Sequence, residues 1–69
     1  MEMEMEMEMY KDLGNTIFIY YKTINVPCPI RWEQELNGWV NIEDYELGYD
    51  KILTYKQLDQ MLQNILDSF

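Results

Sequence analysis

Histidine and alanine are absent from this sequence of 69 residues, and cysteine occurs once, at Cys28. Without histidine, the chain has no imidazole to ligate a metal or to act as a general base near neutral pH. One cysteine forms no internal disulfide, and a structural zinc site needs about four cysteine or histidine ligands. We therefore expect neither a bound metal nor another cofactor.

Basic residues are scarce, since five lysines and arginines stand against thirteen aspartates and glutamates, for a net charge of −8. Four of the acids belong to an N-terminal repeat, so residues 9–69 hold nine acids and five bases. Direct binding of nucleic acid is not expected, because a phosphate backbone requires a basic patch. The favoured partner is a basic protein, such as an enzyme with a nucleic-acid-binding channel.

Long apolar runs are also missing, and none approaches the roughly 20 residues that span a bilayer. The N-terminus lacks the basic and apolar regions of a signal peptide. We expect a cytoplasmic protein without a membrane partner, in the host cytoplasm if a phage encodes it. One domain is expected at this length, and its small core favours added stability from a partner or from a homodimer.

The sequence also lacks catalytic motifs, with no glycine-rich phosphate loop and no nucleophile elbow. The residues from Glu43 onward do not match the ligand spacing of an EF-hand. Cys28 lies between Pro27 and Pro29, and no histidine is present to activate its thiol. A small, half-buried side chain is the preferred interpretation of Cys28. We expect that the protein is not an enzyme.

Residues 1–9 alternate methionine and glutamate without exception. Alternation has the period of a β-strand, yet both residue types favour helices, and Glu4 and Glu8 would repel each other one helical turn apart. Because these signals conflict, we expect a disordered tail before a single α+β domain at residues 10–69. The alternatives are a Cu(I) site of methionine thioethers and an edge strand that becomes ordered on binding.

Residues 15–23 are rich in β-branched and aromatic side chains, which predicts a first strand. Side chains alternate between the two faces of a strand, so Ile17 and Ile19 would share one face and Phe18 and Tyr20 the other. Both faces are then apolar enough to be covered.

The dipeptide Asn37-Gly38 is a strong signal for a β-hairpin. A two-residue turn would pair Leu36 with Trp39, whereas a three-residue turn would pair Glu35 with Trp39. We prefer the second register, because it collects apolar side chains on one buried face. That face would hold Ile30, Trp32, Val40 and Ile42. The open face would hold Arg31, Glu33, Glu35, Trp39, Asn41, Glu43 and Tyr45.

Residues 54–69 show the clearest helical pattern in the chain. Thr54 and Gln57 predict a capping box, and Leu53 and Leu58 occupy the positions of a hydrophobic staple. The apolar residues at helical spacing are Leu58, Met61, Leu62, Ile65, Leu66 and Phe69.

The predicted fold is α+β, with a three-stranded antiparallel sheet packed on one C-terminal helix. Its strands are expected at 15–23, 30–36 and 39–46, and its helix at 54–68. One helix covers only one face of a small sheet, so an aromatic face is expected to stay open. The aromatic residues of that face are Phe18, Tyr20, Trp39 and Tyr45.

This open face is the predicted partner-binding site. Trp39 and Tyr45 are the predicted anchors, because tryptophan and tyrosine are enriched where binding energy is concentrated. Carboxylates around them are expected to imitate phosphates and to steer a basic partner, namely Glu33, Glu35, Glu43, Asp44 and Glu46. The alternatives are that these acids only keep an edge hairpin soluble, or that the face is a homodimer interface.

In its length, acidity and lack of alanine, the chain resembles a type of short phage-encoded protein that inhibits host enzymes by occupying basic nucleic-acid-binding surfaces. Anti-CRISPR proteins and other anti-defence proteins belong to this type, and no sequence motif carries the resemblance. It implies a protein-binding inhibitor that acts as a nucleic-acid mimic. The competing hypothesis is a homo-oligomeric structural or assembly protein without catalytic activity.

Overall fold

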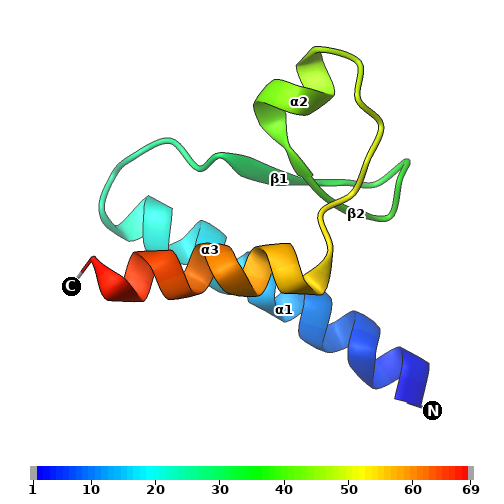
Figure 1. Cartoon of the computed structure of the whole chain (residues 1–69), viewed down its shortest axis with the longest axis horizontal. Helices are drawn as coiled ribbons and strands as arrows, with labels where there is room; N and C mark the ends of the chain where they lie inside the picture. The colour runs from blue at the N-terminus through cyan, green and yellow to red at the C-terminus, as the bar shows by residue number, and fades with distance from the viewer. Residues whose placement is uncertain (1, 69) are drawn as a thin grey trace.

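The computed structural model describes residues 2–68, so Met1 of the repeat and Phe69 of the predicted C-terminal helix lie outside the described residues. Five elements follow one another along the chain (Figure 1), namely α1 (Glu2–Thr23), β1 (Ile30–Glu33), β2 (Gly38–Asn41), α2 (Ile42–Glu46) and α3 (Tyr55–Asp67). The predicted α+β class is confirmed. The predicted three-stranded sheet on one helix is wrong, because residues 2–68 form a two-stranded antiparallel sheet and three helices.

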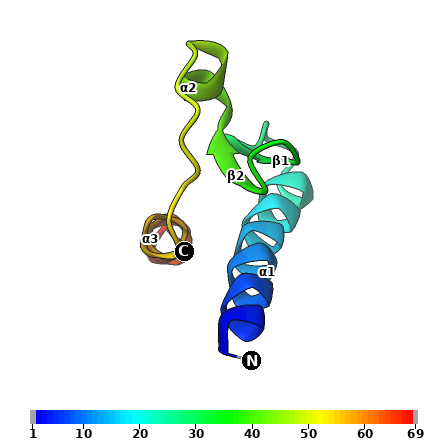
Figure 2. The ribbon, with the colours of Figure 1, turned by 90° about the vertical axis from the view of Figure 1, so that its right-hand side faces the viewer.

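The long helices α1 and α3 lie side by side, and the β-hairpin lies across them (Figure 1). Turning the molecule shows α2 at the end of the hairpin farthest from α1, and the chain that follows α2 runs back past β2 to α3 (Figure 2). None of the helices in the described part of the chain is both long and apolar enough to cross a membrane.

The strand predicted at residues 15–23 is wrong, because these residues belong to α1. In a helix, Leu13 and Ile17 fall on one side, and both are buried in the core. Phe18 and Ile19 point elsewhere and remain 44% and 61% exposed. The β-propensity of a segment is a weak preference, and packing of Leu13 and Ile17 in the core outweighs it.

Helix α1 ends at a residue with a left-handed backbone, Asn25, whose φ is 57°. The Val26 N–H donates to the Tyr21 carbonyl at 3.1 Å, and the Asn25 N–H donates to the Lys22 carbonyl at 3.2 Å. These two bonds form a Schellman motif, which satisfies the last carbonyls of the helix. Pro27 follows and cannot continue a helix, so the chain turns toward β1.

Residues 2–9, for which the sequence predicts disorder, form the first turns of α1. Two residues turn a helix by about 200°, so a two-residue alternation spreads each residue type around the helix. Met7 and Met9 are accordingly about half exposed, and Glu6 and Glu8 are exposed as well. This end of α1 therefore presents both apolar and acidic side chains to the solvent.

Both predicted hairpin registers are wrong, because Trp32 lies opposite Trp39 and Ile30 lies opposite Asn41. The connection spans residues 34–37, and Asn37 adopts the left-handed conformation at φ 54°. The two indoles meet edge to face with ring centroids 5.4 Å apart, a favourable arrangement for aromatic pairs. The contact between Trp32 and Trp39 stabilises this register more than the tight turn predicted at Asn37-Gly38 stabilises the alternatives.

Strand β2 is shorter than the strand predicted at 39–46, because β2 ends at Asn41 and α2 begins with the next residue. The Asn41 side chain accepts a hydrogen bond from the Asp44 N–H at 3.1 Å and caps α2. Asparagine is a favourable N-cap residue. The chain therefore leaves the hairpin at Asn41.

The two faces of the hairpin meet different parts of the chain. Ile30 and Trp39 share one face and are buried in the core with residues of α1 and α3. On the other face, Ile52 packs so closely on Gly38 that a Cβ there would lie 2.5 Å from the Ile52 Cγ2. The Leu53 N–H donates to the Trp39 carbonyl at 2.7 Å, which ties the chain before α3 to β2.

The C-terminal helix was predicted correctly. Thr54 and Gln57 form the expected capping box, because the Thr54 hydroxyl accepts from the Gln57 N–H at 3.1 Å and the Gln57 side chain accepts from the Thr54 N–H at 2.8 Å. Leu58 and Ile65 are buried, and Leu53 packs against the core as the hydrophobic staple predicts.

The core lies between α1, α3 and the hairpin. The indole of Trp39 lies directly on Gly14, where a Cβ would overlap the ring. Glycine at this position therefore allows the hairpin to approach α1. The buried residues of the core are Leu13, Ile17, Ile30, Trp39, Leu58 and Ile65.

Candidate binding surfaces

An acidic cluster surrounds Tyr45 of α2. Glu33 lies at the end of β1, Glu35 in the hairpin connection and Asp50 in the chain after α2, and all three carboxylates act on the Tyr45 hydroxyl. Arg31 is the basic group of the cluster, with its guanidinium 5.2 Å from the centre of the Tyr45 ring and 3.5 Å from a Glu33 carboxylate oxygen. We call these five residues the acidic cluster.

The pKa of the Tyr45 hydroxyl reports the electrostatics of the acidic cluster. Partial burial raises this pKa above its ordinary value of 10.0, and the carboxylates of Glu33, Glu35 and Asp50 raise it further. Arg31 acts in the opposite direction. Because a negative charge is disfavoured here, the acidic cluster has the potential that attracts a cation.

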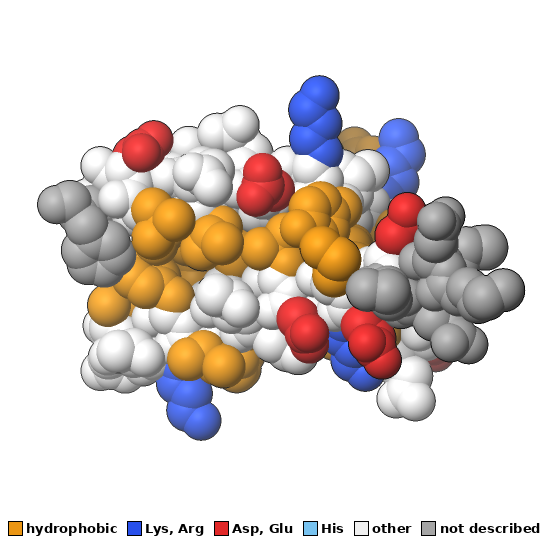
Figure 3. Space-filling model, turned by 90° about the horizontal axis from the view of Figure 1, so that it is seen from below, with side chains coloured by type: hydrophobic (Ala, Val, Ile, Leu, Met, Phe, Trp, Pro, Cys, Tyr) orange, Lys and Arg blue, Asp and Glu red, His pale blue; other side chains and the backbone are white. Residues whose placement is uncertain are grey.

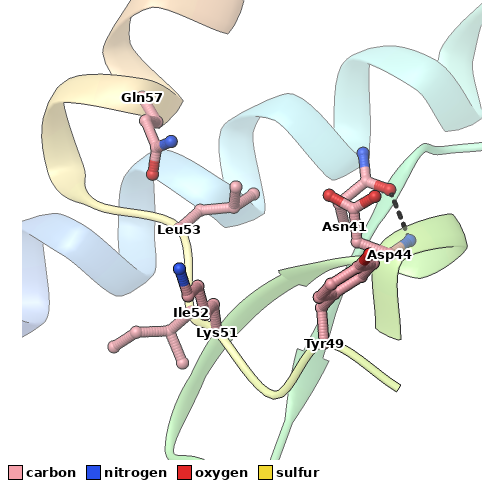
Figure 4. A pocket seen from close by; sticks show the side chains of 7 residues that line it. All are labelled: Asn41, Asp44, Tyr49, Lys51, Ile52, Leu53 and Gln57. Carbon is pink, nitrogen blue, oxygen red and sulfur yellow. Dashed lines mark hydrogen bonds between the residues drawn. The ribbon is translucent and has the colours of Figure 1, made fainter. Parts of the chain in front are cut away.

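Besides Tyr45, three of the predicted site residues lie on α2. Glu43, Asp44 and Glu46 are all exposed. Asp44 lines a pocket together with Tyr49 (Figure 4). The structure thus brings Glu33 and Glu35 of the predicted site to Tyr45, whereas the Asp44 side chain lines this pocket.

Trp39, a predicted anchor, is buried in the core and only 4% exposed. Its backbone N–H donates to the Tyr10 hydroxyl at 2.8 Å, so Trp39 also ties the hairpin to α1. The prediction that Trp39 faces outward depends on the wrong register. Because a partner does not reach a buried indole, Tyr45 is the aromatic residue of the predicted site that remains accessible.

The pocket between α2 and the start of α3 has a volume of about 310 Å³ (Figure 4). Its two amide side chains already serve as caps, since the Asn41 oxygen accepts from the Asp44 N–H and the Gln57 oxygen accepts from the Thr54 N–H. Its charged groups are one carboxylate and the ammonium of Lys51. The polar groups of this pocket therefore have structural partners or offset each other.

A third surface was not predicted from the sequence. Apolar side chains form a continuous stripe along the face of the molecule opposite the hairpin, and aspartate and glutamate side chains lie on both sides of it (Figure 3). Tyr55, Leu62 and Leu66 share one side of α3, because they are spaced by seven and four residues. That spacing was readable in the sequence, but not which side of the helix the core would cover.

Cys28 is half-buried, as expected. Burial raises the pKa of its thiol, and a backbone hydrogen bond from Ile30 opposes the shift. A raised pKa reduces the thiolate fraction, so the environment does not activate this cysteine as a nucleophile. Among the side chains that the structure describes, no three histidine, cysteine, aspartate or glutamate side chains are grouped as metal ligands.

Known proteins give no further guide to function. No protein-family model matches the chain, no curated protein matches it in sequence, and no solved structure matches it.

Proposed function

We propose that the protein is a non-catalytic inhibitor that docks its acidic cluster on a basic, nucleic-acid-binding surface of another protein. The observation that carries the proposal is that three carboxylates, those of Glu33, Glu35 and Asp50, act together on the Tyr45 hydroxyl. Separate segments of the chain bring these groups together, so the fold concentrates negative charge there beyond what the sequence spacing requires.

The acidic cluster supplies two features of a docking site. Its carboxylates attract a basic surface and raise the rate of encounter, as clustered phosphates of a nucleic acid do. Tyr45 supplies an aromatic ring that is already held by Arg31 at 5.2 Å, so little side-chain freedom is lost on binding. Occupation of a basic channel by this cluster would exclude nucleic acid from it.

The experiment is a pull-down from the lysate of a low-GC bacterium, since an alanine-free chain rich in isoleucine, asparagine and tyrosine matches AT-rich codons. Beads are washed at low and at high salt. We expect a basic nucleic-acid-binding protein that is retained at low salt and released at high salt, because exposed ion pairs are screened. The purified partner is then tested for displacement of a labelled oligonucleotide.

Two charge-matched variants locate the contact. Glu33→Gln/Glu35→Gln/Asp50→Asn removes the carboxylates of the acidic cluster, and we expect binding about tenfold weaker, since exposed ion pairs contribute roughly 0.5 kcal/mol each.

The control, Glu4→Gln/Glu8→Gln/Asp67→Asn, removes the same charge from α1 and α3 and is expected to bind nearly as well as the unmodified protein. Equal binding by all three proteins, or a partner that still holds its oligonucleotide, contradicts the proposal.

A further inference from the structure

The proposed function does not use the apolar stripe between α1 and α3 (Figure 3). We define it by Met9 and Tyr20 of α1 and by Tyr55, Leu62 and Leu66 of α3. Met9, Tyr55 and Leu66 are each between 44% and 53% exposed, and Tyr20 and Leu62 pack partly against the core. Monomeric proteins rarely expose contiguous apolar patches larger than a few hundred Å², and larger patches commonly mark a binding site.

One end of the stripe is hollowed. Glu6, Met9 and Tyr55 line a depression of about 370 Å³, and Glu6 and Tyr55 also line a neighbouring depression of about 330 Å³. Among the side chains that the structure describes there, the walls are mostly apolar, and Glu6 lines both depressions. An apolar hollow with a carboxylate suits a lysine or arginine side chain, which has an apolar stem and a cationic head.

The charge along the stripe restricts the occupant further. Besides Glu6, Asp12 lies three residues after Met9 on α1, and Asp59 lies four residues after Tyr55 on α3, and both are exposed. Their helical spacing places them beside the stripe, in agreement with the acids on both sides of it in Figure 3. The stripe is thus apolar along its middle and acidic along its edges.

A second copy of this chain fits such a surface poorly. A symmetric contact places the same patch of each copy against the other, so the bordering acids of both copies would be crowded into one interface. Each chain carries thirteen acids and five bases, which leaves few cations to offset them. Like charges in an interface cost binding energy, whereas a cationic partner gains from the same groups.

We propose that the apolar stripe binds a basic amphipathic helix of a partner protein, with the apolar side of that helix against the stripe and its lysines or arginines against Glu6, Asp12 and Asp59. The inference rests on the proposed function in one respect, that the partner is basic. Flexible methionine side chains suit such a groove, because they adapt to the shape of a bound helix. Met7 and Met9 place exposed thioethers at the hollowed end.

The probe is a synthetic helical peptide of about 18 residues, with leucines on one side and lysines on the other. At 1.5 Å per residue it is about 27 Å long, which fits along the 34 Å length of the molecule. Binding is measured by calorimetry with the full chain. A peptide of the same composition in scrambled order is the control for charge alone, and we expect it to bind at least about tenfold more weakly, equivalent to about 1.4 kcal/mol.

Variants locate the contact on the protein. Met9→Ser and Leu66→Ser change half-exposed residues of the stripe, and we expect each to weaken binding of the helical peptide by about tenfold. The matched control is Leu47→Ser, which changes a side chain that is 75% exposed at the end of α2. It is expected to leave the affinity unchanged. Urea unfolding of each variant verifies that the fold is retained.

Three outcomes would overturn the inference. Equal binding of the ordered and scrambled peptides would mean that charge alone attracts them. A loss caused by Glu33→Gln/Glu35→Gln/Asp50→Asn, with none from Met9→Ser or Leu66→Ser, would place the peptide on the acidic cluster and leave the proposed function standing. A stable homodimer in sedimentation equilibrium that Leu66→Ser dissociates would assign the stripe to a second copy.

Discussion

Helices α1 and α3 enclose the same core, yet their sequences specify them in different ways. In α3 the apolar residues occupy one side, and Thr54 and Gln57 mark its beginning with a capping box. In α1 apolar residues surround the helix, since Ile17 is fully buried whereas Ile19 is 61% exposed. A helix with apolar residues on one side is recognisable from sequence, whereas one with apolar residues all around resembles a buried strand until its neighbours are known.

The largest expected effect distinguishes a helix from a strand at residues 15–23. In a strand, Ile17 and Ile19 share a face, but in α1 they lie on different sides. We expect Ile17→Ala to lower the free energy of unfolding by about 3 kcal/mol and Ile19→Ala to change it by no more than about 0.5 kcal/mol. Urea unfolding followed by tryptophan fluorescence measures both. Similar losses of stability in the two variants would support a strand at residues 15–23 in place of the helix.

The contact between α1 and the hairpin gives the next largest effect. In Gly14→Ala the new methyl group overlaps the Trp39 indole, which has to move. Overpacking of this kind costs about 1–3 kcal/mol, more than the gain in helix propensity from replacing glycine. Thermal unfolding followed by circular dichroism is the measurement. A variant more stable than the unmodified chain would show that the indole does not lie on α1.

Loss of the N-cap of α3 is expected to lower the free energy of unfolding less than loss of these tertiary contacts. Thr54→Ala removes the acceptor of the Gln57 N–H, and we expect a loss of about 1 kcal/mol. Thr54→Ser keeps the hydroxyl and serves as the control, with nearly unchanged stability. If both substitutions destabilise the protein equally in urea, the methyl group and not the cap is what Thr54 contributes.

The smallest expected effect is a change in the free energy of unfolding in alkaline solution. Burial raises the pKa of Tyr10 on α1 above its ordinary value of 10.0 and the pKa of Cys28 above its ordinary value of 9.0. The unfolded chain therefore loses these protons first, so the free energy of unfolding falls as the pH rises from about 8 through the folded-state pKa values. Below about pH 8 both groups are protonated in both states, so they contribute almost no slope.

The variant Tyr10→Phe measures how much of this pH dependence of stability comes from Tyr10. It removes the titrating hydroxyl, so the fall in stability above pH 10 is expected to be shallower than in the unmodified chain. The same variant at pH 7 shows the separate cost of losing the acceptor of the Trp39 N–H. Identical slopes in the two proteins would show that Tyr10 does not titrate differently on folding.

The candidate site was predictable in part. Glu33, Glu35 and Tyr45 were chosen for their residue types, and the fold does bring them together. Asp50 was missed because it follows the strand predicted at 39–46, although it is only five residues after Tyr45. The chain turns at Gly48, whose φ is 98°, and Asp50 acts on the Tyr45 hydroxyl. Trp39 was misplaced because a shift in hairpin register exchanges the faces of a strand.

The sequence by itself determined the features that depend on neighbouring residues. These are the capping box and apolar side of α3, the presence of a hairpin near Gly38 and the negative charge. Each follows from contacts within a few residues or from composition, so no knowledge of distant segments is needed.

Only the tertiary structure decided the helical state of residues 15–23, the pairing of Trp32 with Trp39 and the position of the apolar stripe. Each depends on which distant segment covers a given side chain. Burial of a large apolar side chain is worth roughly 1.5–3 kcal/mol, whereas β-propensity differences are within about 1 kcal/mol. Packing around Gly14 and Trp39 therefore outweighs the local preferences of the chain.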